Sequence, residues 1–169
     1  MTLFDGDPPA RPAFSPPAAP APQPDALILQ FDGGSRGNPG PAGIGVSLCD
    51  EDGTPLYELA EFLGRCTNNV AEYTALLRGL AAARRIGATR VEVHSDSELL
   101  VRQINGIYKV KSPDLKPLYQ KVTALMDQIG HVTVGHVYRE GNERADELAN
   151  MAMDTGRRLE PLGALDIWK

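Results

Sequence analysis

Cysteine is scarce in this chain of 169 residues, which contains only Cys49 and Cys66. The two cysteines form no CxxC pair, so their spacing favours buried thiols in a reducing compartment over a disulfide scaffold or a structural zinc site. The first seven residues carry acids where a secretion signal has basic residues, and no apolar stretch follows them. We therefore expect a cytoplasmic protein.

Long hydrophobic runs are also missing, since no apolar stretch approaches the roughly 18 residues that a membrane span requires. The composition of 42% hydrophobic and 23% charged residues is that of a globular protein without membrane segments. The length predicts about one domain, because single cores usually organise roughly 100 to 200 residues.

Basic residues are too few for binding nucleic acid through overall charge. The chain has 17 Lys and Arg against 22 Asp and Glu, a net charge of −5, which excludes a histone-like protein. A local basic groove stays open. The acidic excess has a second interpretation, because a site for divalent cations concentrates carboxylates.

Composition divides the chain into three parts. Residues 1–25 are rich in proline and alanine, and we expect a disordered tail because such a segment cannot bury enough apolar surface to fold. Residues 26–155 carry the regular hydrophobic patterns and form the predicted domain. Residues 156–169 are left as a C-terminal extension.

Hydrophobic periodicity and turn residues predict the elements of this domain. Strands are expected at 27–31, 43–49, 57–64, 91–94 and 132–138, and helices at 69–86, 97–104, 112–129 and 142–153. The motif Ser112-Pro113-Asp114 opens the third of these helices. The order predicts an α/β (α+β) fold with a mixed five-stranded sheet, three antiparallel strands followed by two parallel ones, flanked by helices.

Four acids fall at the ends of these elements. Asp32 ends the first strand, Asp96 follows the fourth, and Glu72 and Asp146 lie in the first turns of their helices. Converging carboxylates repel one another unless a cation lies between them, and oxygen ligands without His or Cys indicate Mg²⁺ or Mn²⁺. Taken singly, the acids have alternative roles as a turn residue, a helix cap or partners of helix dipoles.

Four stretches surround these acids: FDGGSRGNPGPAGIG at 31–45, TNNVAEYTAL at 67–76, SDSELLVRQI at 95–104 and REGNERADELAN at 139–150. In this order they resemble the type 1 ribonuclease H family over roughly residues 26–154. The resemblance implies the ribonuclease H-like fold. It also implies an endonuclease that hydrolyses the RNA strand of RNA–DNA hybrids and leaves 5′-phosphate and 3′-hydroxyl ends.

The resemblance also implies a metal site. Asp32, Glu72, Asp96 and Asp146 match the family's catalytic acids, which hold two Mg²⁺ ions, with Mn²⁺ as a substitute. In that two-metal, in-line mechanism one ion generates the attacking hydroxide and the other stabilises the leaving 3′ oxygen.

Further residues are implied to contact substrate. Glycines after Asp32 let the backbone turn and approach a ligand, polar groups detect ribose hydroxyls in the minor groove, and two residues grip a phosphate of the DNA strand. These residues are Gly33, Gly34, Ser35, Asn38, Asn68, Asn69, Arg65 and Thr67. For Arg65 and Thr67 the alternative is a polar turn before a helix.

The sequence departs from familiar bacterial members at the loop before the last acid, which carries a histidine there. His136 falls within a predicted strand and is interpreted as a sheet residue. Arg139 resembles the arginine that replaces the histidine in archaeal and some bacterial relatives, and we place it among the catalytic residues. Because an arginine cannot act as a base at neutral pH, it is expected to bind phosphate or help expel product.

A second departure concerns the surface that follows the duplex. Glu98 stands where familiar members have a glutamine that contacts RNA, and its alternative is a first-turn acid favoured by the helix dipole. The basic handle is absent, but residues 101–125 hold five basic residues against Asp114. Lys109 and Lys111 in this window, beside Tyr108, are expected to contact the duplex.

Two other functions compete with this one. A non-catalytic hybrid-binding module would have no reason to keep all four acids, and an exonuclease or transposase-like nuclease would not need the asparagines beside them. We expect a monomer whose partner is the RNA–DNA hybrid, with double-stranded RNA left open as a substrate.

Overall fold

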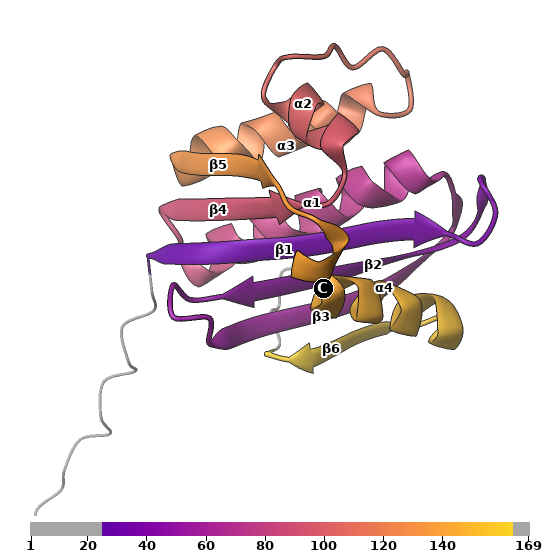
Figure 1. Ribbon diagram of the computed structural model, residues 1–169, viewed down its shortest axis with the longest axis horizontal. Coiled ribbons are helices and arrows are strands. Elements are labelled where there is room, and N and C mark those ends of the chain that lie inside the picture. Colours follow the sequence, from indigo (N-terminus) through magenta and orange to yellow (C-terminus); the bar gives the residue numbers. More distant parts are fainter. Residues whose placement is uncertain (1–24, 164–169) are drawn as a thin grey trace, which may run out of the picture.

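The computed structural model describes residues 25–163. The tail predicted for residues 1–25 therefore lies, except for Asp25, outside the described residues. The elements along the chain are β1 (Ala26–Ser35), β2 (Gly40–Cys49), β3 (Pro55–Cys66), α1 (Asn68–Ile86), β4 (Arg90–Ser95), α2 (Glu98–Ile104), α3 (Lys116–Ile129), β5 (His131–His136), the 3₁₀ helix η1 (Arg139–Gly141), α4 (Glu143–Thr155) and β6 (Arg158–Leu162) (Figure 1).

The strands form one mixed sheet in the order β5-β4-β1-β2-β3-β6. The antiparallel meander β1-β2-β3 and the parallel strands β4 and β5 confirm the predicted fold class and topology. The sheet has six strands, not five. The sixth, β6, lies in the segment left as a C-terminal extension and pairs antiparallel with β3. Its proline, Pro161, made the segment a poor strand candidate, but an edge strand tolerates proline.

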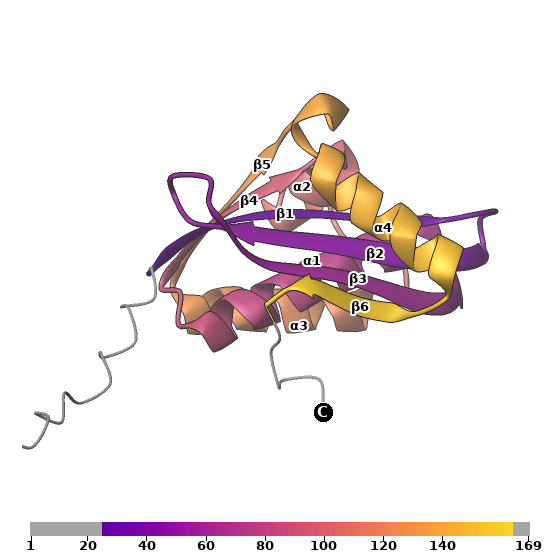
Figure 2. The same cartoon turned by 90° about the horizontal axis from the view of Figure 1, so that it is seen from below.

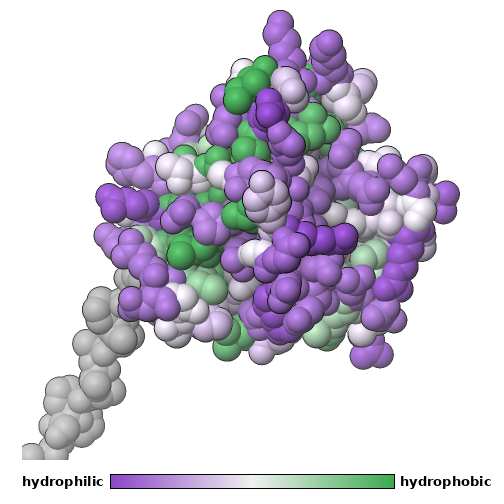
Figure 3. Space-filling view, in the orientation of Figure 1, coloured by the Kyte–Doolittle hydropathy of each residue, from purple (hydrophilic) through white to green (hydrophobic). Residues whose placement is uncertain are grey.

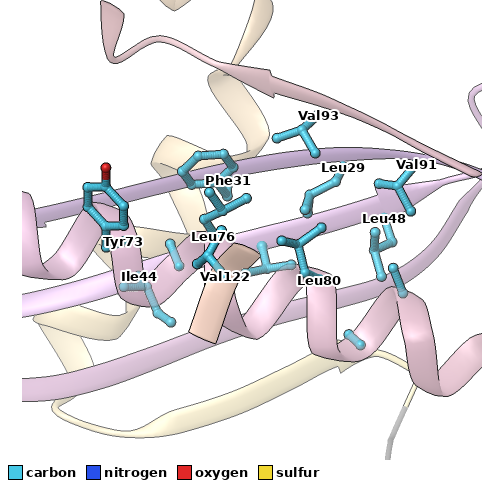
Figure 4. Packing of buried hydrophobic residues seen from close by; sticks show 14 of the residues in the cluster. Leu29, Phe31, Ile44, Leu48, Tyr73, Leu76, Leu80, Val91, Val93 and Val122 are labelled. Atoms are coloured by element: carbon cyan, nitrogen blue, oxygen red, sulfur yellow. The ribbon is translucent and has the colours of Figure 1, made fainter. Parts of the chain in front are cut away.

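Helices cover the sheet on both faces. Figure 2 shows α1 and α3 on one face and α4 on the other. The main core lies between the sheet and α1, where Leu29, Phe31 and Ile44 of the strands meet Leu76 and Leu80 of the helix (Figure 4). Because the buried side chains on β1 alternate, the neighbouring residues Gln30 and Asp32 point to the opposite face, where α4 begins.

The structure moves several predicted boundaries. β1 continues through Gly33 and Gly34 to Ser35, so Asp32 lies inside the strand and does not end it. The motif Ser112-Pro113-Asp114 precedes α3 and does not open it, because the helix begins at Lys116. β5 ends at His136, so the predicted strand was two residues too long at that end.

The long helix α1 is capped at both ends. The side chain of Thr67 caps its first turn by accepting a hydrogen bond from Val70 N at 3.2 Å, and Gly87 ends it in the left-handed conformation with φ 104°. Since the helix starts at Asn68, the prediction that Glu72 lies in its first turn was wrong, and Glu72 lies one turn further along.

The structure also bears on membrane association. Of the helices within residues 25–163, none combines the length and the apolar character needed to cross a lipid bilayer.

Candidate metal centre

Three of the four acids converge at one edge of the sheet. In the parallel register of β1 and β4, Gln30 pairs with His94, and Asp32 and Asp96 come two residues later on each segment. The third acid, Glu72, comes from α1, which packs on β1. One oxygen from each of the three carboxylates lies within 4.8 Å of the others, close enough to share a metal ion.

The approach of α1 to β1 depends on Gly33. A Cβ atom at this position would lie 2.4 Å from Ala71 C and 2.6 Å from Glu72 N. Only glycine permits this contact, which holds the start of Glu72 against the strand that carries Asp32. Gly33 was expected to let the backbone turn after Asp32. In the structure it forms no turn and instead allows the backbones of β1 and α1 to touch.

The fourth acid, Asp146, lies in the first turn of α4, as predicted. It lines the same cleft as the other three acids, although it stands outside the 4.8 Å group. Its carboxylate is near enough to Asp32 to raise the pKa of that residue. The sheet and both of its helical layers thus contribute to the site.

The electrostatics of the cluster are those of crowded, partly buried anions. Burial, followed by the charges of Asp96 and Asp146, raises the pKa of Asp32 from 3.8 to about 7. Burial and the neighbouring carboxylates of Asp32 and Asp96 raise the pKa of Glu72 well above its ordinary value. A cation between these groups would favour their ionised forms.

A buried oxygen supports the same interpretation. Glu72 Oε2 has no hydrogen-bond partner among the described residues, although buried carboxylate oxygens ordinarily have one. A metal ligated by this oxygen would satisfy it. The donor set consists of carboxylate oxygens, which suits a hard divalent cation and fits neither zinc nor copper well.

The cleft around the acids includes several residues expected to contact substrate. Those that line it are Gly33, Gly34, Ser35, Asn68 and Arg139. Those that do not are Asn38, Arg65, Thr67, Asn69, Glu98, Lys109 and Lys111. The cleft also holds residues that sequence reasoning missed, among them Arg36, Tyr138 and Asn150.

Asn38 is exposed and does not line the cleft, but it bonds to a residue that does. Its Oδ1 accepts a hydrogen bond from Asn68 N at 3.1 Å, and Asn68 Oδ1 in turn accepts from Ser35 N at 2.8 Å. These bonds join the β1–β2 turn to the start of α1. Asn68 and Asn69 are both exposed, and these bonds hold Asn68 in place.

The segment before α1 holds Arg65 and Thr67, which were expected to grip a phosphate or to form a polar turn. Thr67 uses its hydroxyl to cap the helix, a structural role more specific than the polar turn named as the alternative. Arg65 is exposed near the end of β3, where its guanidinium group is accessible to a phosphate. Contact of these residues with a DNA strand stays a prediction.

Two nitrogen-bearing side chains stand at the rim of the cleft. Arg139 lies in η1 with 80% of its side chain exposed, and its Nη2 is 3.9 Å from Asp146 Oδ1. His136 ends β5, which confirms its interpretation as a sheet residue, but it also lines the cleft and packs edge-on against Tyr138. Its position at the end of β5, next to the end of β4, was the signal that could have identified it.

The remaining predicted contacts lie away from the acids. Glu98 is an exposed first-turn acid of α2 and pairs with Arg102 at 2.7 Å, which agrees with its alternative structural role. Lys109 and Lys111 line a separate hollow with Leu99, Ile107 and Tyr108. Figure 3 shows apolar side chains among hydrophilic ones over this upper part of the molecule.

Comparison with known proteins identifies relatives of this domain. The family described as reverse transcriptase-like matches residues 30–152. The chain is 35% identical over 155 residues to a protein named ribonuclease H from Polaromonas sp., covering 78% of this chain and 92% of that protein.

A longer relative and a solved structure are also similar. The bifunctional protein Rv2228c of Mycobacterium tuberculosis is 48% identical over 129 residues, which are 76% of this chain and 35% of that protein, so the chain spans about a third of its length. LC11-RNase H1, solved in complex with an RNA/DNA hybrid, superposes with a TM-score of 0.74 at 47% identity, covering 77% of this chain and 98% of that one.

Proposed function

The chain belongs to the type 1 ribonuclease H family, and from this premise we propose that it is a metal-dependent endonuclease acting on the RNA strand of RNA–DNA hybrids. Cleavage leaves 5′-phosphate and 3′-hydroxyl ends. The relative of similar structure that was solved with a hybrid supports the substrate.

One observation carries the proposal. Carboxylate oxygens of Asp32, Glu72 and Asp96 approach one another within 4.8 Å, and Glu72 Oε2 is buried without a partner among the described residues. Such crowding of like charges costs stability unless a cation offsets it. A non-catalytic reader would not need this arrangement.

The cofactor we propose is Mg²⁺, as two ions, with Mn²⁺ as a substitute. Asp32, Glu72, Asp96 and Asp146 would hold the ions, since all four acids face the cleft. When bound, such ions offset phosphate charge and promote ionisation of water. Without bound metal, the carboxylates of the cleft repel the phosphates of a nucleic acid.

Other residues of the chain bind and orient the substrate. Asn68, fixed by its bonds to Asn38 and Ser35, presents polar groups at the cleft, where a ribose 2′-hydroxyl can be distinguished from deoxyribose. Arg139 is exposed beside Asp146 and binds the scissile phosphate, because a guanidinium group stays charged at neutral pH.

The duplex extends from the cleft across other surfaces of the domain. Lys109 and Lys111, both exposed, contact its backbone beyond the acids, and Arg65 takes a phosphate of the DNA strand. Double-stranded RNA presents the same 2′-hydroxyl groups and is a candidate second substrate.

We also propose a monomer in the cytoplasm. A single chain supplies all four acids, which supports the monomer. Cys49 and Cys66 are free thiols, as in a reducing compartment.

A substrate comparison tests the function. The purified chain is incubated with a hybrid, an all-DNA duplex and double-stranded RNA of one sequence, with Mg²⁺ or Mn²⁺ titrated from zero. We expect metal-dependent cutting of the RNA strand of the hybrid and none of the DNA duplex. Efficient cutting of the DNA duplex would reject the substrate.

Variants assign that activity to the site. Asp146→Asn should remain folded and lose cleavage, while Asp127→Asn, which changes an exposed acid on α3, should cleave like the unchanged protein. Retained cleavage in Asp146→Asn and also in Asp32→Asn would reject the assignment.

A further inference from the structure

A buried asparagine links the two segments that carry Asp32 and Asp146. Asn142 is fully buried, and its Nδ2 donates a hydrogen bond to the carbonyl oxygen of Phe31 at 2.8 Å. The two residues are 111 positions apart in the sequence. The carbonyl group of Phe31 belongs to the same peptide unit as the nitrogen of Asp32.

The same asparagine is bonded to the other acid through its backbone. The Asp146 N–H donates to the Asn142 carbonyl oxygen at 3.1 Å in the first turn of α4. Asn142 therefore contacts the Asp32 segment with its side chain and the Asp146 segment with its main chain.

The side chain of Asn142 does not perform the task that its position in the helix favours. An asparagine at an N-cap usually accepts a hydrogen bond from the first turn, but Asn142 makes no side-chain cap bond to α4. Its Oδ1 is buried without a partner among the described residues. The amide thus gives up helix capping and binds β1.

We propose that Asn142 is a positioning residue, which fixes the first turn of α4 on β1 so that Asp32 and Asp146 present their carboxylates to a shared divalent cation. This inference rests on the proposed function and deepens it. Asn142 touches neither substrate nor metal, and it acts through the backbone of the two acids.

Other contacts hold α4 on the sheet independently of Asn142. Arg144 pairs with Glu58 of β3 through two hydrogen bonds, and Gln30 Nε2 of β1 donates to the Gly141 carbonyl oxygen at 3.1 Å. Because these contacts remain in a variant of Asn142, the helix should stay docked while its first turn loses its defined position.

The test removes the Asn142 side-chain amide, which donates the hydrogen bond to Phe31, in two ways. Asn142→Asp keeps the shape of the side chain and removes its N–H groups, and Asn142→Ala removes the side chain without adding a charge. Gln30→Ala is the matched control, because it deletes a bond between the same two segments at a more exposed position. Mn²⁺ binding is measured by the EPR signal of the free ion, with kcat, KM and thermal unfolding alongside.

We expect both Asn142 variants to bind Mn²⁺ about ten- to a hundredfold more weakly and to lose kcat by a similar factor, the usual effect of removing a residue that orients ligands. Their KM for the hybrid should stay within about threefold, because the substrate contacts are unchanged. Gln30→Ala should resemble the unchanged protein in Mn²⁺ affinity and kcat.

Two results would overturn the proposal. One is Mn²⁺ affinity of Asn142→Ala equal to that of the unchanged protein, with kcat reduced only in proportion to the folded fraction. The other is an equal loss of Mn²⁺ affinity in Gln30→Ala. If the unchanged protein bound Mn²⁺ but cut no hybrid, the proposed function would fail, while the Mn²⁺ measurements would still decide the role of Asn142.

Discussion

The backbone of Gly33 lies against the peptide group of Ala71, so closely that a Cβ atom on the glycine would stand 2.4 Å from Ala71 C. The contact joins β1 to α1 one residue from each of two clustered acids. Gly33→Ala should therefore push the helix away and lower the free energy of unfolding by about 1–3 kcal/mol, the usual cost of overpacking. Urea denaturation measures this change.

Gly34→Ala is the control for this prediction. The nearest atom to its added Cβ would be Asn68 Oδ1 at 4.0 Å, an ordinary contact. The variant should keep its urea midpoint. Equal stability losses in the two variants would show that the close packing of Gly33 is not what matters.

The stability of the metal-free protein should depend on pH through Asp32. Burial and the charges of Asp96 and Asp146 raise its pKa to about 7, above that of the unfolded chain, so the folded state retains a proton that the unfolded state releases. This stability is greatest at acid pH and is lost as the pH rises from about 4 to 7.

Thermal unfolding in EDTA checks this dependence. The melting temperature should fall between about pH 5 and 7. Asp32→Asn should reduce the slope and melt higher at neutral pH, because it removes one buried negative charge. Added Mg²⁺ should stabilise the unchanged protein most above about pH 7. A melting temperature that rose with pH in EDTA would contradict the prediction.

The ion pair between Arg144 and Glu58 should contribute measurably to stability. The Glu58 side chain is 11% exposed, and both of its oxygens accept bonds from the guanidinium group, at 2.5 and 3.0 Å. Glu58→Gln should lower the unfolding free energy by about 1–3 kcal/mol, less than a fully buried pair because Arg144 is partly exposed. The mostly exposed partner Glu147 offers the comparison, and Glu147→Gln should change stability by less than about 0.5 kcal/mol.

Arg139 should increase the rate of hybrid cleavage without changing how that rate depends on pH. Its guanidinium group stays charged at every working pH, so it binds phosphate and transfers no proton. Arg139→Ala should lower kcat/KM about ten- to a hundredfold, and Arg139→Lys should keep part of the activity. A pH–rate profile measured for both variants should keep the shape of the original. If the pH–rate profile of Arg139→Ala lost its acidic or its basic limb, Arg139 would have a different role.

Lys109 and Lys111 should contribute to hybrid affinity through charge alone. Replacing both with glutamine should weaken binding and reduce the slope of log affinity against log salt by about one for each phosphate that is no longer neutralised. Fluorescence anisotropy at several salt concentrations measures both effects. Arg85→Gln, an exposed position in the last turn of α1, should leave the slope unchanged.

Local patterns predicted much of the fold. The helical spacing of apolar residues in α1, the apolar run at the start of β1 and the acids of the four motifs all correspond to observed features. Interpretation failed where a long-range contact overrides a local preference. Gly33 and Gly34 were interpreted as a turn, but both are extended because they pair with Ile44 and Gly43 of β2, and α1 packs closely on Gly33 alone of the two.

The contacts of the site itself were the least predictable. Asn142 resembles an ordinary helix cap in the sequence, and its bond to Phe31 exists only because β1 and α4 meet in space. β6 was missed for a similar reason, since Arg158–Leu162 becomes a strand by pairing with β3. The secondary-structure propensity of a segment carries no information about which distant segment it will pair with.

The last helix also determines when the proposed nuclease first becomes active during synthesis. The chain leaves the ribosome from its N-terminus, so Asp32, Glu72 and Asp96 emerge before Asn142 and Asp146 do. A nascent chain thus lacks one wall of the cleft until nearly all of the domain has emerged.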